Sequence, residues 1–447
     1  MCVLAYVCAA SLPEWSVVQS VPSIADFCFF ANLWNDLAML PPFLKKRRIY
    51  LDYASATPLH ADVLRAMQPY LTGSFGNPSA THAEGREARA VLEDARKIVA
   101  DTLVTRVSDI VFTSGGTESN NLALFGVVDV LHAEGRAYAD MEIITTAIEH
   151  PSILEPLRVL TARGVVVKYV PVDGEGMIDE KVFGTLLNEK TVLVTFAYAN
   201  SEIGVVQEVK ALARAIRLFK KKCASAVSHL PYFHLDASQA PLYLPCQTDS
   251  LGVDLMSIDA GKCNGPKGVG VLALRNMSKL VSHQYGGSQE GGLRPGTQNV
   301  ALAVGCAAAL ERAQKGWQAR AKEVGARRDF FEEKTATAFP TLHLNGSCTH
   351  RIANNLNISI PGIDGEFAVV GLDTRGIAAS TRSACKTNES LDDGGSHVLR
   401  ALGLTNDIVL GAIRFSLGEE TTKKELLAAV AALEAHAHIV LRAHTSA

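Results

Sequence analysis

Hydrophobic and polar positions along the middle of the chain alternate between strand-like and helix-like patterns. Between residues 61 and 318, short apolar runs such as Thr191-Val-Leu-Val-Thr-Phe196 recur between longer stretches with helical spacing. Strands that alternate with helices in this way predict a mostly parallel sheet with helices on both faces. We therefore expect residues 61–318 to form a large α/β domain.

After residue 318 the pattern changes to that of a smaller α+β domain, which we expect to cover residues 319–447. Strand patterns lie at residues 353–360 and 412–416. Thr422-Lys-Lys-Glu425 has the spacing of a capping box and predicts the start of a terminal helix. One face of that helix is apolar and is interpreted as core packing rather than as a groove for a partner; its residues are Leu426, Val430, Leu433, Ala437 and Val440.

The first 48 residues have a different composition from the remainder. Residues 1–44 contain no lysine or arginine, and the basic run Lys45-Lys-Arg-Arg48 follows them. A secretory signal peptide has a basic n-region at its start, so this pattern does not fit one. We interpret residues 1–48 as an atypical N-terminal extension with no part in catalysis, and Met39 as an alternative start. Residues 49–60 are a lead-in segment expected to pack with the small domain.

Composition narrows the class of protein. The 447 residues carry a formal net charge of −3 and are 48% hydrophobic, so two cores are expected and no electrostatic footprint for nucleic acid is present. No apolar run has the length of a membrane span. The nine cysteines form no C-x-x-C pair and no zinc spacing, so we expect a cytoplasmic enzyme without a stable metal site.

Candidate chemistry lies where strand patterns end. Lys262 and Asp236 each follow a buried strand pattern, and pyridoxal phosphate needs an amine for a Schiff base and a carboxylate for its pyridine nitrogen. Thr117 follows a Gly-Gly turn that opens a helix, a geometry suited to phosphate. His150 and Asn200 also follow strands. Ligands of parallel sheets bind at the carboxyl ends of the strands, so these side chains are expected to converge.

Motifs in the same order occur in a known family. The chain resembles the class V pyridoxal-phosphate-dependent aminotransferases and, within them, cysteine desulfurases of the NifS/IscS type. The resemblance runs from residue 49 to about residue 422. The motifs that carry it include residues 49–58 (IYLDYASATP), 114–119 (SGGTES), 234–239 (HLDASQ), 286–299 (GGSQEGGLRPGTQN), 382–385 (RSAC) and 413–418 (IRFSLG).

The resemblance implies a fold of the pyridoxal-phosphate transferase type I and a role for each matching residue. Lys262 would bind the cofactor covalently, and Asp236 would pair with the pyridine nitrogen. His150 would stack on the ring and, as a catalytic residue with Lys262 and Cys385, would move protons. The remaining cofactor-binding residues would be Gly116, Thr117, Asn200, Gln239 and, from the second subunit of a homodimer, Thr297. Arg414, together with Asn200, would bind the substrate carboxylate.

Cys385 would be the nucleophile that takes sulfur from L-cysteine as a persulfide. Its segment, about residues 379–396, is polar and rich in glycine and serine, which predicts a mobile surface loop. Arg382 and Lys386 flank the thiol, and cationic neighbours favour the reactive thiolate. Cys385 is also the candidate for a transient iron–sulfur ligand.

The lysine segment departs from the family pattern. The family usually has Ser-x-His-Lys, with the serine touching the phosphate, whereas this chain has Asp259-Ala-Gly261-Lys262. A carboxylate near a phosphate is unfavourable unless it points away or is bridged. The resemblance thus leaves the effect of Asp259 and Gly261 on cofactor affinity open.

The function implied is conversion of L-cysteine to L-alanine, with transfer of sulfur to an acceptor protein for iron–sulfur cluster assembly or tRNA thiolation. No membrane and no direct nucleic-acid contact are expected. Two alternatives stay open at this point. One is a selenocysteine lyase or related lyase on the same scaffold, and the other is a non-catalytic relative that binds a partner in sulfur transfer.

Overall fold

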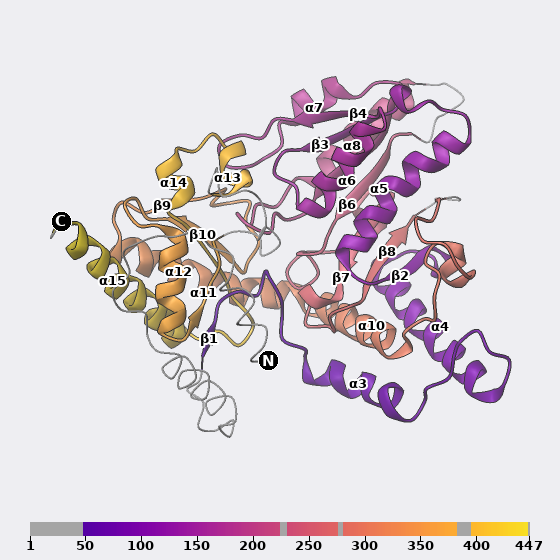
Figure 1. The fold of residues 1–447 in the computed structure, drawn as a ribbon, viewed down its shortest axis with the longest axis horizontal. Coiled ribbons are helices and arrows are strands. Elements are labelled where there is room, and N and C mark those ends of the chain that lie inside the picture. Colours follow the sequence, from indigo (N-terminus) through magenta and orange to yellow (C-terminus); the bar gives the residue numbers. More distant parts are fainter. Residues whose placement is uncertain (1–47, 224–229, 276–279, 382–394, 446–447) are drawn as a thin grey trace, which may run out of the picture. The chain divides into compact units, whose positions relative to one another are not determined.

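The computed structural model describes most of the chain after the N-terminal extension (Figure 1). The described residues are 48–223, 230–275, 280–381 and 395–445. Cys385, Arg382 and Lys386, for which roles are predicted above, lie outside the described residues, and so do residues 1–47 of the extension.

A seven-stranded sheet forms the centre of the α/β part of the molecule. Only β8 runs antiparallel to its neighbours β7 and β2, and the other adjacent pairs are parallel. In spatial order the strands are β2 (Ile110–Thr113), β8 (Gly270–Leu274), β7 (Leu255–Asp259), β6 (Tyr232–Asp236), β5 (Thr191–Ala197), β3 (Glu142–Thr146) and β4 (Val166–Val170).

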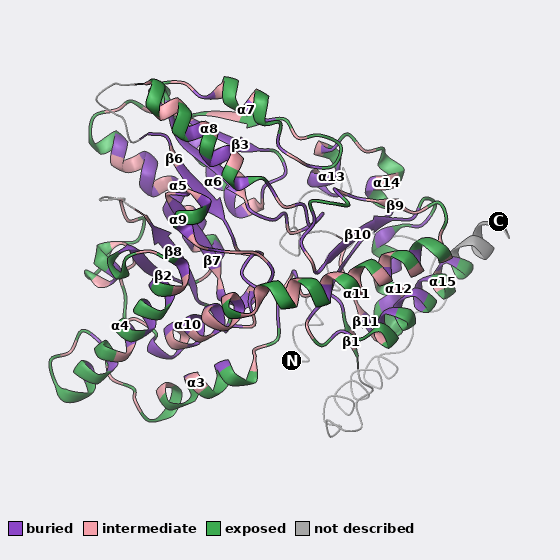
Figure 2. Ribbon diagram, turned by 180° about the vertical axis from the view of Figure 1, so that it is seen from behind, coloured by how far each residue is buried: buried purple, intermediate pink, exposed green. Residues whose placement is uncertain are grey.

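Helices cover both faces of this sheet because its strands are apolar on both sides. In β8, Val271 and Ala273 belong to one core, and Leu272 and Leu274 belong to the core on the opposite face. The first core includes side chains of α4 (Ala83–Leu103), α7 (Glu180–Leu186), α8 (Val209–Lys222) and α10 (Val300–Lys315). The second includes those of α5 (Gly116–Ala133) and α6 (Pro151–Ala162), and Figure 2 shows the strands buried between the helices.

The C-terminal part is built on a three-stranded antiparallel sheet in the order β12 (Ala412–Ser416), β10 (Asn355–Ser359), β9 (His343–Leu344). Both strands predicted here, at residues 353–360 and 412–416, are confirmed. Its core includes side chains of α11 (Trp317–Ala338), α12 (Gly365–Thr374) and α15 (Lys423–Thr445). The remaining helices are α3 (Ala61–Thr72), α9 (Thr248–Leu251), α13 (His397–Ala401) and α14 (Asn406–Leu410), with 3-10 turns at Val107–Asp109, Tyr138–Asp140, Ala260–Lys262 and Gln289–Gly292.

The terminal helix begins as its capping box predicts. The backbone N–H of Glu425 donates to the Thr422 hydroxyl at 3.2 Å, and the N–H of Thr422 donates to the Glu425 carboxylate at 2.8 Å. Four of the predicted face residues, Leu426, Val430, Leu433 and Ala437, lie in the core, which confirms core packing. The side chain of Val440 lies outside the described part.

The lead-in segment connects the C-terminal sheet region to the lysine turn. Strand β1 (Ile49–Tyr50) pairs in parallel with β11 (Ile377–Ala378), and Leu51 lies in the C-terminal core. Further along, the Thr57 hydroxyl donates to the backbone oxygen of Gly261 at 2.9 Å. This path brings the backbone of the segment next to the turn that follows β7, where Lys262 Nζ donates to the Ala54 oxygen.

The predicted α/β fold, with a mostly parallel sheet between helices, is confirmed. Among the helices described, none combines the length and the apolar character that a membrane crossing would require.

Candidate functional site

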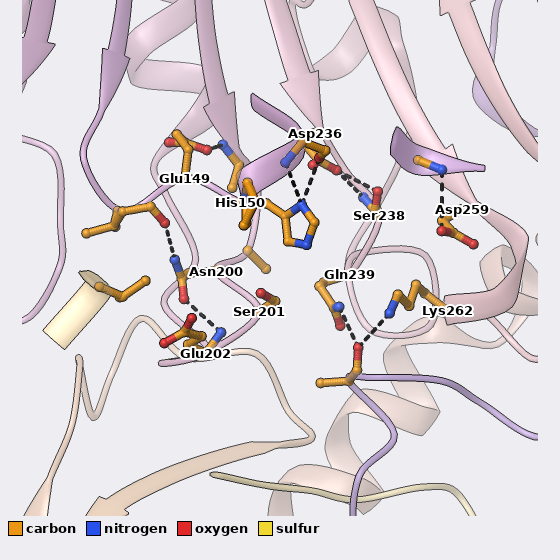
Figure 3. A pocket seen from close by; sticks show the side chains of 18 of the residues that line it. Glu149, His150, Asn200, Ser201, Glu202, Asp236, Ser238, Gln239, Asp259 and Lys262 are labelled. Carbon is orange, nitrogen blue, oxygen red and sulfur yellow. Dashed lines mark hydrogen bonds between the residues drawn. The ribbon is translucent and has the colours of Figure 1, made fainter. Parts of the chain in front are cut away.

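A pocket opens where the large sheet, the first turns of α5 and α6, and the lead-in segment meet (Figure 3). Most residues predicted from the sequence line it: Gly116, Thr117, His150, Asn200, Asp236, Gln239, Lys262 and Arg414. Thr297 is exposed and does not line the pocket formed by its own chain. Cys385 lies outside the described residues. The convergence follows from topology, since β5, β6 and β7 are neighbouring parallel strands that end at the same edge.

Lys262 lies in the 3-10 turn (Ala260–Lys262) that follows β7. Its Nζ donates to the backbone oxygen of Ala54 at 3.0 Å and also to that of Ser55. The side-chain amide of Gln239 donates to the same Ala54 oxygen at 3.0 Å, as Figure 3 shows. The lead-in segment therefore orients two predicted site residues.

Asp236 ends β6, and its carboxylate is held by neighbours on both oxygens. Oδ1 accepts from the Ser238 hydroxyl at 2.6 Å and from the Ser238 N–H at 3.0 Å. Oδ2 accepts from the amide of Asn120 at 2.8 Å. Three hydrogen bonds fix the direction of this carboxylate within the pocket.

A short hydrogen-bond chain connects Asp236 to His150. The Asn120 amide also donates to the Ser152 hydroxyl at 2.9 Å, and that hydroxyl lies 2.8 Å from His150 Nδ1. The backbone N–H of Ser152 donates to the same Nδ1 at 3.0 Å, so His150 caps the N-terminus of α6, where Pro151 follows at N1. Because Nδ1 accepts these hydrogen bonds, the proton of the neutral ring lies on Nε2.

Two buried titratable groups lie at the pocket: Glu149 lines it, and His234 is not among its lining residues. Burial, together with the negative charge of Asp236, raises the pKa of Glu149 to about 8. Hydrogen bonds from Thr146 at 2.6 Å and from the Ala197 N–H at 2.8 Å act in the opposite direction. Burial lowers the pKa of His234 to about 4. Its two ring nitrogens contact the hydroxyls of Thr195 and Ser257 at 2.8 and 3.0 Å. Both groups are therefore neutral at pH 7, and Glu149 lines the pocket together with Asp236 and Asp259.

The N-terminus of α5 forms another wall of the pocket. Gly115 precedes the helix with φ of 150°, a conformation that residues with a side chain rarely adopt. A Cβ on Gly116 would lie 2.8 Å from the Ser238 hydroxyl, so any other residue here would force that hydroxyl to move. The N–H of Gly116 donates to Asp259 Oδ2 at 3.3 Å. Asp259 thus faces the helix N-terminus and does not point away from it.

Arg414 is the largest fully buried side chain of the described residues and comes from the middle of β12. Its guanidinium donates to Asp52 Oδ1 at 2.6 Å, to the Ser55 hydroxyl at 2.7 Å and to the Ser201 backbone oxygen at 3.1 Å. The ion pair with Asp52 holds its planar head group at the pocket.

Asn200 has a structural role in addition to its place in the pocket wall. Its amide donates to the Ile148 backbone oxygen at 2.7 Å, and its side-chain oxygen accepts from the N–H groups of Glu202 and Ile203 at 2.8 and 3.0 Å. These bonds form an Asx turn that shapes the loop after β5.

Several contributors were not assigned from the sequence. Asn120 and Ser152 connect Asp236 with His150, Ser238 holds Asp236, and Asp52 and Ser55 hold Arg414. Ser238 could have been found, because a serine two residues after a strand-end aspartate commonly closes an Asx turn. The contacts of Asp52 and Ser55 span more than 350 residues of sequence and have no local signal.

The residues present fit pyridoxal phosphate. The pocket offers an amine, an oriented carboxylate, a flat imidazole and a helix N-terminus. Among described residues, three buried polar atoms of pocket-lining side chains have no hydrogen-bond partner, Asn120 Oδ1, His397 Nδ1 and Arg414 Nε. Buried polar groups are nearly always paired, so these three are suited to a bound ligand.

Comparison with known proteins agrees with this geometry. Residues 49–428 match the family model described as aminotransferase class-V. Cysteine desulfurase IscS of Dictyoglomus turgidum is 39% identical over 381 residues, which cover 85% of this chain and 92% of that protein. A solved structure of a NifS-like protein has a TM-score of 0.79 at 33% identity and covers 88% of this chain and 100% of its own. SspA, solved in complex with cysteine, has a TM-score of 0.70 at 31% identity and covers 84% and 100%.

Proposed function

We propose that this chain, which belongs to the class-V aminotransferase family, is a pyridoxal-phosphate-dependent cysteine desulfurase that converts L-cysteine to L-alanine. The observation that carries the proposal is the convergence of Lys262, Asp236, His150 and Arg414 on one pocket. These side chains match, residue by residue, the motifs that imply the desulfurase site. The alignments of this chain with relatives named cysteine desulfurase extend over 92% and 90% of those proteins, which supports the same assignment.

In the proposed reaction the cofactor, when bound, withdraws electrons from the amino acid attached to it. Lys262 binds the cofactor through its amine. Asp236, held by Asn120 and Ser238, offers a fixed negative charge to the pyridine nitrogen. His150 would stack on the ring and, with its proton on Nε2, would exchange a proton with the substrate.

Arg414 binds the carboxylate of the incoming cysteine. Its guanidinium is planar and two-pronged, it is fixed by Asp52 and Ser55, and its Nε remains available to an acceptor.

Cys385 is the proposed nucleophile. Its thiolate forms a bond with the sulfur of the substrate while the bond between that sulfur and the β-carbon breaks. The electron pair of the broken bond stays on the carbon, which takes up a proton and becomes the methyl group of alanine. The sulfur remains on Cys385 as a persulfide.

Two further parts of the proposal concern assembly and delivery. The protein acts as a homodimer, in which Thr297 of the partner subunit completes the phosphate site. The exposed position of Thr297, outside the pocket of its own chain, agrees with this arrangement. The persulfide is then transferred to an acceptor protein such as an iron–sulfur scaffold.

The experiment that tests the proposal is Cys385→Ala in the cofactor-loaded protein. The variant should still bind cysteine, observed as a change in the visible absorption of the cofactor, but should release neither alanine nor sulfide. Wild-type protein after one turnover should carry a single added sulfur on the peptide with Cys385. Cys348→Ala, which removes an exposed thiol, is the matched control and should retain activity. Sulfide release by Cys385→Ala at the wild-type rate would contradict the desulfurase mechanism and favour a lyase.

A further inference from the structure

Asp259 is a carboxylate that already lies at the place where the helix N-terminus of the pocket receives an anion. Its Oδ2 accepts from the N–H of Gly116, the first residue of α5, at 3.3 Å. Virtual Cβ atoms on Gly115 and on Gly116 would each lie 3.6 Å from the same oxygen. The carboxylate therefore lies against the Gly-Gly turn itself, where the first backbone N–H groups of a helix attract negative charge.

The position of Asp259 is fixed by a second hydrogen bond. Its Oδ1 accepts from the N–H of Gly261 at 2.8 Å and so caps the 3-10 turn that carries Lys262. Rotation of the side chain away from α5 would disrupt the hydrogen bond to Gly116. Glycine at position 261 is buried and leaves this space to the carboxylate, because a Cβ there would lie 3.1 Å from Oδ1.

An independent observation indicates that the same pocket is built for a ligand. Asn120, four residues after Gly116 on α5, is 1% exposed, lines the pocket and has no partner for its Oδ1 among the described residues. Its amide is fixed by Asp236 and Ser152. The part of α5 that lines the pocket thus carries one buried acceptor without a partner in the described part of the chain, Asn120 Oδ1, and a helix N-terminus whose first N–H donates to Asp259.

We propose that Asp259 competes with the phosphate of the cofactor for the N-terminus of α5, and that it lowers the preference of the pocket for pyridoxal phosphate over phosphate-free pyridoxal. Asp259 is thus a specificity-determining residue for the cofactor. The inference rests on the proposed function, because it concerns the same pyridoxal site. Pyridoxal keeps the aldehyde for Lys262 and the pyridine nitrogen for Asp236, so only the phosphate is affected by the aspartate.

Two effects oppose phosphate binding in this arrangement. A phosphate at the Gly-Gly turn has to displace a carboxylate from the Gly116 N–H, and the two anions repel each other inside a partly enclosed site. Removal of the charge should therefore strengthen the binding of pyridoxal phosphate by about tenfold or more, while it leaves the binding of pyridoxal within about twofold.

The test is equilibrium binding of pyridoxal phosphate and of pyridoxal to the full-length protein stripped of cofactor, followed by calorimetry. Asp259→Asn keeps an oxygen for the Gly261 N–H, removes the charge and leaves an NH2 group in place of the oxygen that accepts from the Gly116 N–H. Asp259→Ser is a second variant in case the first folds poorly. Asp254→Asn is the matched control, since it removes the same charge from the residue that precedes the other end of β7. Inorganic phosphate is the competitor in each titration.

The expected result is a higher ratio of pyridoxal-phosphate affinity to pyridoxal affinity in both Asp259 variants, stronger competition by inorganic phosphate, and a wild-type ratio in Asp254→Asn. An unchanged ratio in folded Asp259→Asn and Asp259→Ser would overturn this inference and leave the proposed function intact. A folded wild-type protein that binds neither form of the cofactor would instead overturn the proposed function, and this inference with it.

Discussion

Replacement of Arg414 by lysine separates substrate positioning from simple charge. Arg414 is 1% exposed and donates to Asp52, Ser55 and the Ser201 oxygen at 2.6, 2.7 and 3.1 Å. Lysine keeps the positive charge and its pairing with Asp52, but it lacks the planar fork that holds a carboxylate with two prongs. Loss of one hydrogen bond between charged groups removes about 1.5–3 kcal/mol, which corresponds to a fall in kcat/KM of about 10- to 150-fold.

The assay is alanine formation over a range of cysteine concentrations, with thermal unfolding measured in parallel. Arg351→Lys is the matched control, because Arg351 is also buried and donates to the backbone oxygens of Ser347, Ile203 and Asn345 at 2.9, 3.0 and 2.6 Å, but does not line the pocket. It should lower Tm and leave kcat/KM unchanged. If Arg414→Lys lowers Tm as Arg351→Lys does and leaves kcat/KM at the wild-type value, Arg414 has no role in binding the carboxylate.

Three other predictions follow from the same contacts. Lys262→Ala should abolish both turnover and the cofactor adduct trapped by borohydride, while the protein still folds. Lys267→Ala should retain the adduct, and an adduct found on another lysine would refute the assignment of Lys262. Glu149→Gln should remove a dependence of apo-protein stability on pH, because native Glu149 keeps its proton up to a pKa of about 8 whereas the unfolded group releases it above its ordinary 4.5. The free energy of unfolding of the wild-type protein should therefore fall, relative to that of the variant, by about 1.4 kcal/mol per pH unit as the pH rises between these values. A difference between the two proteins in urea unfolding that stays constant with pH would contradict this. Ser152→Ala should lower kcat more than it raises KM, since it removes the hydroxyl at 2.8 Å from His150 Nδ1, and an unchanged kcat would exclude that role.

The fold was predictable from local patterns wherever those patterns were strong. The capping box at Thr422 and the strand at residues 412–416 depend on neighbours within a few residues, and both are present as predicted. The convergence of His150, Asn200 and Asp236 was also predictable, because the carboxyl ends of neighbouring parallel strands share one edge.

The supporting residues were less predictable for a physical reason. The hydrogen bond from the Ala54 N–H to the Ser416 hydroxyl joins residues 362 positions apart, so nothing near either residue signals it. The direction of Asp259 depends on the 3-10 turn that follows β7, where its Oδ1 caps Gly261. A propensity pattern can locate the end of that strand, but it does not determine where a side chain in the turn after it will point.

The lead-in segment has a consequence for the order in which the pocket can assemble during synthesis. Lys262 and Gln239 are oriented by the backbone of Ala54, which is made early, whereas Arg414 is made near the end of the chain and then binds Asp52 and Ser55. A nascent chain that has not yet released β12 from the ribosome therefore has no complete substrate site. Since a ligand stabilises only the state that binds it, the amino-acid substrate would stabilise the finished chain and not the nascent one.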